Sequence, residues 1–185
     1  MKRIFLTALA ICLLTFASVA GAQQQPNYNF VPVTDYGAQG FVEQMITCRT
    51  YQQLKQNGNL IAFVSPVRRQ DLDDPQNFPN MSVYKSDFGI KGAPNSDGQI
   101  RFYVSPDNHV YIVQVINENM NNPQVSQAVL LMTLETLGLS DPEGNTLLQT
   151  PTPVAETWCQ GTGRKIIRVI TDQAGNNILF FGASN

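Results

Sequence analysis

His109 is the single histidine among the 185 residues, and it directly follows the turn sequence Ser105-Pro106-Asp107-Asn108. A Ser-His-Asp or Cys-His site would have to use this imidazole, with Cys48 or Cys159 as a candidate nucleophile. Neither cysteine is surrounded by the sequence signature of a nucleophile, so a histidine in a surface turn is the simpler interpretation. A small hydrolase that uses His109 or a pair of acidic residues is therefore the alternative function.

The cysteines indicate a disulfide rather than a catalytic thiol. Of the three cysteines, Cys12 lies in an N-terminal segment that we expect to be removed, which leaves Cys48 and Cys159. Disulfides persist in the compartments that receive exported proteins, and two cysteines allow one internal pairing. We predict the disulfide Cys48–Cys159, which would close a loop of about 110 residues and contribute on the order of 4 to 5 kcal/mol in the chain-entropy model.

The densest group of carboxylates is formed by Asp71, Asp73 and Asp74, close to Asn77 and Asn80. Ca²⁺ takes such oxygen ligands, but the group lacks the alternating acidic positions and the terminal glutamate of an EF-hand loop. A zinc site is excluded because histidine and cysteine ligands are too few and lack the usual spacing. We therefore predict an acidic turn exposed to solvent, with no metal and no cofactor.

A long loop is predicted from Arg68 to Asn80, because this stretch holds two prolines and several Asp and Asn residues. Its apolar residues either pack onto the domain or stay exposed until they contact a partner. We expect the loop to be mobile and to take part in binding. Aromatic residues follow the loop, and two arginines fall on one face of a later predicted strand. The candidate partner-binding residues are thus Leu72, Phe78, Tyr84, Phe88, Arg164 and Arg168.

Composition excludes several classes of protein. The chain is 43% hydrophobic and 14% charged, which is too apolar for a disordered chain, and its length suits one domain. The formal net charge is -2, and the 12 Lys and Arg residues are spread over the whole chain. A nucleic-acid-binding surface needs clustered basic residues, so we expect no nucleic acid partner.

The first 22 residues are typical of a bacterial-style signal peptide. Lys2 and Arg3 precede an apolar stretch from Ile4 to Phe16, and Ala20-Gly21-Ala22 provides a cleavage site of small residues. The apolar stretch is shorter than the ~20 residues of a spanning helix, so we expect no transmembrane segment in the mature chain. We predict cleavage after Ala22 and export to the periplasm or the extracellular medium.

A lipoprotein signal is the minority alternative for this segment. Cys12 follows small and apolar residues, but Ile11 is too bulky for the position before a lipidated cysteine. After the signal peptide, residues 23–36 are polar and interrupted by prolines, which predicts an extended N-terminal arm. The remaining residues, 37–185, are predicted to form a single domain.

Three helices are predicted from apolar spacing and helix-terminal residues. Apolar residues recur every three or four positions from Ala38 to Gln56. A second, largely buried helix starts at Asn122-Pro123 and ends at Gly138, since Asn is a favoured N-cap, Pro a favoured first residue and Gly a favoured C-terminal residue. A third, short helix is predicted over Val154 to Cys159.

Apolar runs separated by turn residues predict the strands of an antiparallel sheet. The fold class is therefore α+β, with about five or six strands and helices packed on one face. We expect an exported, non-enzymatic protein that binds a protein or envelope partner through its sheet edge or its long loop. The predicted strands are Leu60–Val64, Met81–Tyr84, Gln99–Val104, Val110–Ile116, Lys165–Ile170 and Asn177–Phe181, and Phe88–Ile90 is a further candidate.

Overall fold

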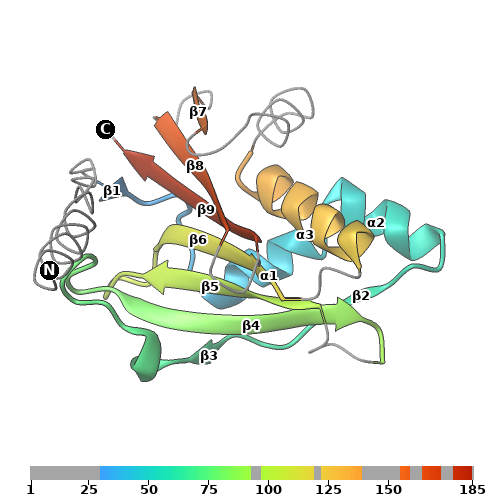
Figure 1. Cartoon of the computed structure of the whole chain (residues 1–185), viewed down its shortest axis with the longest axis horizontal. Coiled ribbons are helices and arrows are strands. Elements are labelled where there is room, and N and C mark those ends of the chain that lie inside the picture. The colour runs from blue at the N-terminus through green and yellow to red at the C-terminus, as the bar shows by residue number, and fades with distance from the viewer. Residues whose placement is uncertain are drawn as a thin grey trace, which may run out of the picture.

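The structure is a computed structural model that describes residues 30–92, 97–118, 122–138, 155–158, 164–171 and 177–184. The predicted signal peptide, most of the predicted arm and Cys159 lie outside these residues. Within them the chain forms an α+β arrangement of three α-helices and one antiparallel sheet (Figure 1), which confirms the predicted fold class.

The first predicted helix is in fact two helices, α1 (Ala38–Met45) and α2 (Arg49–Gln56). The apolar spacing of α1 buries Ala38, Phe41, Val42 and Met45 against the core. The helical backbone then stops, because Cys48 is extended (ψ 162°) and serves as the N-cap of α2. The prediction of one continuous helix was wrong because a carboxylate from a distant helix binds the start of α2, as described below.

Helix α3 (Pro123–Thr136) begins and ends as its sequence predicts. Asn122 is the N-cap, and Gly138 follows the last turn with a φ of +74°, a conformation that glycine adopts without strain. Val129, Met132 and Leu134 are buried, which confirms a largely buried helix, whereas Leu131 is only partly buried. Helix α3 packs against both α1 and α2.

The strands form one sheet in the order β2-β4-β5-β6-β9-β8-β7, with β1 paired to β9 and β3 paired to β4. Five of them have seven to nine residues and match the five or six expected: β4 (Ser82–Ile90), β5 (Gly98–Val104), β6 (Val110–Asn117), β8 (Arg164–Thr171) and β9 (Asn177–Ser184). The others have two to four residues: β1 (Phe30–Val31), β2 (Ile61–Phe63), β3 (Val67–Arg68) and β7 (Ala155–Trp158).

Strand β7 corrects the predicted short helix over Val154–Cys159. Its residues pair antiparallel with β8, from Ala155 opposite Ile167 to Trp158 opposite Arg164. The pairing with β8 outweighs the weak helical preference of this short segment, and a local sequence pattern does not reveal such a distant partner. The predicted pairing of the last two strands is confirmed, and β9 also pairs with β6.

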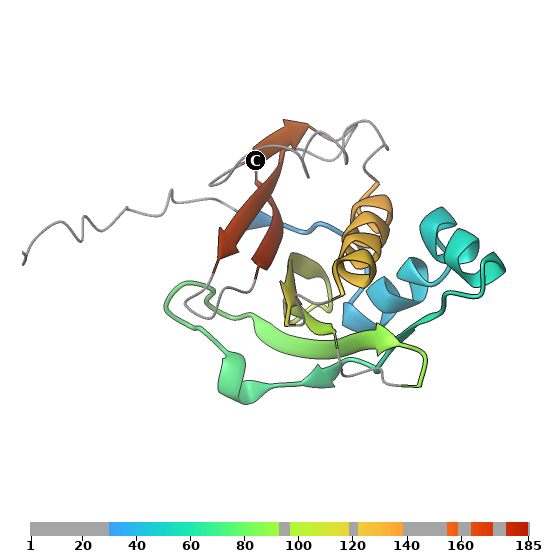
Figure 2. The ribbon, with the colours of Figure 1, turned by 45° about the vertical axis from the view of Figure 1, so that its right-hand side comes forward.

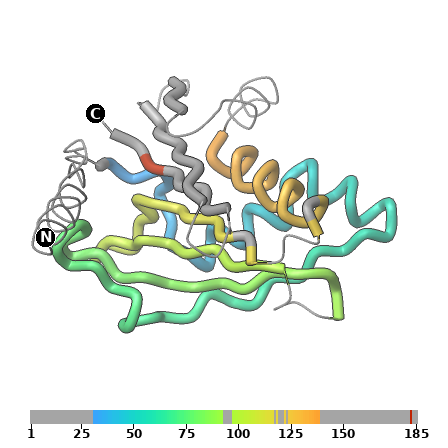
Figure 3. Tube along the Cα trace, viewed as in Figure 1, coloured from blue at the N-terminus to red at the C-terminus, as the bar shows by residue number. Residues whose placement is uncertain are grey.

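The two faces of the sheet are covered differently (Figure 2). Helices α1 and α3 pack on one face, where Phe41, Phe102 and Met132 belong to the main core. The opposite face carries a small cluster of Val83, Tyr103 and Ile112, which is covered by side chains of the segment that follows β3. That segment, with its single 3-10 turn η1 (Gln70–Leu72), lies beside β4 at the edge of the sheet (Figure 3).

The residues before α1 are bound to the sheet rather than free. Phe30 pairs with Ser184, and the N–H of Val33 donates to the carbonyl of Val110 over 2.8 Å. The N–H of Val110 in turn donates to the carbonyl of Tyr36 over 3.1 Å. From Phe30 onward, the predicted arm is therefore part of the folded domain.

Candidate functional site

The turn between β5 and β6 brings Ser105, Asp107 and His109 together, but in the wrong order for a catalytic triad. The Ser105 hydroxyl donates to the Asp107 carboxylate, and Asp107 Oδ2 lies 3.2 Å from His109 Nδ1. A triad needs the imidazole between the hydroxyl and the carboxylate, whereas the carboxylate lies between the other two groups here. These contacts stabilise an exposed turn, and they lower the pKa of Asp107, chiefly through the Ser105 hydrogen bond.

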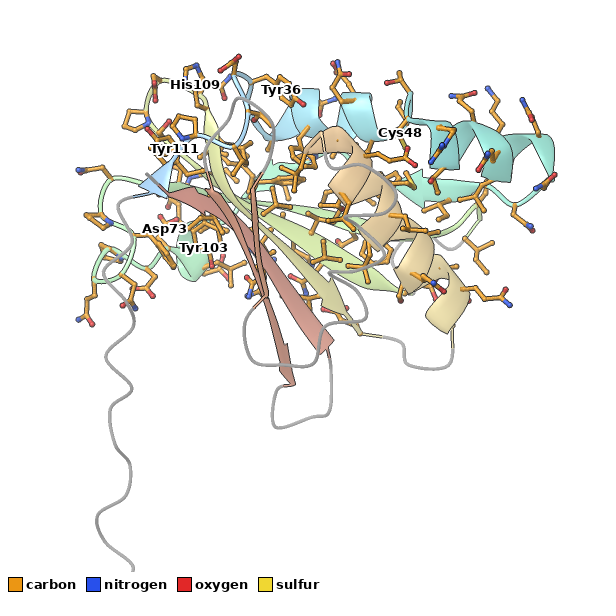
Figure 4. The ribbon with its side chains drawn as sticks, turned by 90° about the horizontal axis from the view of Figure 1, so that it is seen from above. Tyr36, Cys48, Asp73, Tyr103, His109 and Tyr111 are labelled. Carbon is orange, nitrogen blue, oxygen red and sulfur yellow. The ribbon has the colours of Figure 1, made fainter. Side chains whose placement is uncertain are left out.

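Cys48 lies at the junction of α1 and α2, well away from His109 (Figure 4). The pKa of its thiol is raised to about 11, mainly by burial and also by its contact with Glu135 of α3. A thiol with such a pKa is a poor nucleophile at neutral pH. Cys48 forms no disulfide within the described part of the chain, and Cys159 lies outside it.

Glu135 holds the start of α2 in place. The N–H of Thr50 donates to Glu135 Oε2 over 3.1 Å, and its hydroxyl donates to Oε1 over 2.6 Å. Arg49 Nη2 lies 3.6 Å from the same carboxylate. Burial favours a higher pKa for Glu135, but the two Thr50 hydrogen bonds and the other contacts lower it overall. The carboxylate acts as an N-cap supplied from another helix, which is a structural role.

Each carboxylate of the predicted acidic turn is bound by a neighbour. Asp73 accepts two hydrogen bonds from Arg68, of 2.9 and 2.5 Å, and one from the N–H of Val83 of 3.0 Å. Asp71 accepts two from Arg69, and Asp74 accepts from the side chain and backbone of Asn77. No group of three metal-ligating side chains occurs among the described residues.

Leu72 and Phe78 pack onto the sheet instead of standing free in a loop. Both cover the small cluster on the face without helices, and the Phe78 ring lies 4.8 Å from the Tyr103 ring, centroid to centroid, in an edge-on arrangement. Asp73 fastens the same segment to β4 through the N–H of Val83. Of the two alternatives for the apolar residues of this loop, the structure favours packing onto the domain.

Phe88 is fully buried in the main core and belongs to no binding surface, which corrects its predicted role. Its ring lies over Gly98 on the neighbouring strand, where a Cβ atom would come within 2.6 Å of the ring. Tyr84 is partly buried against the same core. Arg164 and Arg168 belong to β8, and Arg168 pairs with Phe180, but their side chains lie outside what the structure describes.

Two hollows lie at the start of β2 among the described residues. One, of about 370 Å³, lies among the end of α2, the start of α3 and β2. The other, of about 450 Å³, lies between α1–α2 and β2. Leu60, Ile61 and Lys91 line both, so the two hollows adjoin, and we call them together the β2 groove. Other apolar residues that line it are Val42, Ile46, Tyr51, Leu54, Ala62, Phe63, Ile90, Val125 and Ala128.

The β2 groove lies beside an unpaired strand edge. Within the described sheet, β2 has a neighbour, β4, on one side only. The N–H of Val64 donates to the carbonyl of Asp87 on β4 over 2.8 Å. Because backbone groups alternate in direction along a strand, those of Ile61 and Phe63 point away from β4, toward the open side. An extended segment lying in the groove can therefore add one more strand to the sheet.

Large apolar side chains are exposed at both ends of the groove. Ile46, at the end of α1, is 37% exposed, and Ile90, at the end of β4, is 51% exposed. Apolar hollows bordered by polar groups are common sites for binding a partner. The sequence analysis recognised the strand around Leu60–Val64 but not the groove, since the groove combines residues of α1, α2, β2 and the start of α3.

Among the described residues, every buried side-chain nitrogen and oxygen atom has a hydrogen-bond partner. Of the helices in the described residues, none is long and apolar enough to span a bilayer.

Comparison with protein-family models, curated proteins and solved structures finds no match to this chain.

Proposed function

We propose that this chain is an exported, non-enzymatic protein that binds a protein partner in the envelope or outside the cell. The observation that carries the proposal is the β2 groove, which is lined by both apolar and polar residues and adjoins the free edge of β2. Main-chain hydrogen bonds to Ile61 and Phe63 supply affinity for an extended segment, and the apolar hollows supply selectivity. No comparable observation favours the alternative of a hydrolase.

The partner-binding part of the proposal is tested by affinity capture from the envelope of the host. Ile46→Arg places a charge in the groove, and Gln76→Arg is the matched control because Gln76 is exposed on the loop at η1, away from the groove. We expect the wild type and the control to capture the same partner and Ile46→Arg to lose it. Equal capture by all three would refute binding at the groove.

Export is tested by the intact mass of the protein isolated from its host without a reducing agent. The proposal expects removal of the first 22 residues and a Cys48–Cys159 disulfide, which lowers the mass by two hydrogens. Such a bond requires the Cys48 thiol to leave its contact with Glu135. A chain that retains its first 22 residues and has free thiols at both Cys48 and Cys159 would contradict both export and the disulfide.

A further inference from the structure

Lys91 lies at the point where the two hollows of the β2 groove adjoin, because it lines both of them. It follows β4 directly, and its backbone N–H donates to the carbonyl of Leu60 over 2.9 Å, which fixes its position beside β2. Its side chain is exposed. A ligand that reaches from one hollow to the other therefore lies beside Lys91.

The groove carries an excess of positive charge. Its charged residues are Lys55, Lys91 and Glu43, and Glu43 already accepts a hydrogen bond of 2.9 Å from Gln39. Within the described residues, neither lysine forms an ion pair with a carboxylate. By contrast, Lys85 on the open face of the sheet lies 2.8 Å from Asp87. The cations of the groove are thus left available for a partner.

We infer that the β2 groove binds an extended apolar segment of a partner protein that carries a carboxylate side chain, with Lys91 as the residue that receives it. This inference rests on the proposed function and narrows it to one class of ligand. Apolar side chains on both sides of the carboxylate fill the two hollows and exclude water from the ion pair, which strengthens it. The segment is short, because Pro66 interrupts the edge after β2 and lacks a backbone N–H.

The test uses the full mature chain and a fluorescent heptapeptide of β-branched and leucine residues around one central glutamate. A second peptide has glutamine in place of the glutamate. We expect the wild type to bind the glutamate peptide about 5-fold more tightly at low salt, and the preference to fall as salt is added. Lys91→Gln removes the preference, whereas the control Lys85→Gln, whose lysine lies outside the groove, keeps it.

Two results would overturn the inference without touching the proposed function. Equal binding of the two peptides by the wild type would show that the carboxylate contributes nothing. If neither peptide binds, while the wild type still captures the partner and Ile46→Arg does not, the groove binds a different kind of segment. Equal capture of the partner by the wild type, Ile46→Arg and Gln76→Arg, in contrast, refutes the proposed function itself.

Discussion

The capping of α2 by Glu135 gives a quantitative prediction for Glu135→Gln. The carboxylate accepts from both the backbone N–H and the hydroxyl of Thr50, on two different oxygens. Glutamine keeps one acceptor oxygen and places an amide NH₂ against the second donor, so one hydrogen bond is lost and the contact with Arg49 loses its charge. We expect the free energy of unfolding at about pH 7 to fall by about 1 to 2 kcal/mol.

The effect of this substitution depends on pH. The folded state lowers the pKa of Glu135. Ionisation therefore stabilises the fold above the unfolded pKa, and this stabilisation is lost as the pH falls through the folded pKa. Urea unfolding of the wild type and Glu135→Gln should give midpoints that differ at about pH 7 and converge once the pH falls below the folded pKa of Glu135. At neutral pH the melting temperature should drop by about 2 to 8 °C.

Two results would refute this account of α2. Equal stability at neutral pH would mean that the hydrogen bonds between Glu135 and Thr50 do not hold the helix. A difference of the same size at neutral and acidic pH would mean that the loss comes from altered packing rather than from the charge. Thr50→Val, which removes only the hydroxyl that donates to Oε1, is a matched variant and should cost less than Glu135→Gln.

Three further predictions concern the core and the loop. Leu134→Ala should lower the free energy of unfolding, measured with urea, by about 2 to 5 kcal/mol because the Leu134 side chain is buried. Leu131→Ala should lower it less because Leu131 is only partly buried. Equal losses would contradict the described packing of α3. Asp73→Asn should lower the free energy of unfolding by about 1 to 2 kcal/mol at neutral pH. The hydrogen bonds from Arg68 lower the folded pKa of Asp73, so the difference between the two chains should vanish as the pH falls below that pKa. A loss that does not depend on pH would contradict the ion pair. Limited proteolysis should leave residues 68–80 intact in the wild type and cut them in Phe78→Ala, and early cutting of the wild type would show that the packing of Phe78 on Tyr103 does not hold the loop.

Much of the fold is predictable because its signals are local. Asn122, Pro123 and Gly138 mark the ends of α3 by their backbone preferences, and the long strands follow from apolar runs between turns. The break before α2 and the strand nature of β7 are not predictable in this way. Each depends on a partner distant in sequence, Glu135 in the first case and the backbone of β8 in the second.

The candidate site was harder to predict than the fold. The alternation of β4 places Phe88 in the core, where Gly98 makes room for its ring, and a short sequence pattern cannot tell which face is covered. Leu72 and Phe78 had no periodic element to pack on, yet a second small cluster receives them. The β2 groove combines residues from α1, α2, β2 and the start of α3, so only the folded arrangement brings them together.

Photo-crosslinking in the host tests the central claim, binding of a partner protein at the β2 groove, most directly. A photoreactive phenylalanine derivative replaces Ile46 in the groove in one chain and the exposed Gln76 on the loop at η1 in another. We predict one discrete adduct from position 46, lost when the unlabelled wild-type chain is co-expressed in excess, and none from position 76. Equal adducts from both positions, or an adduct from position 76 alone, would contradict the claim.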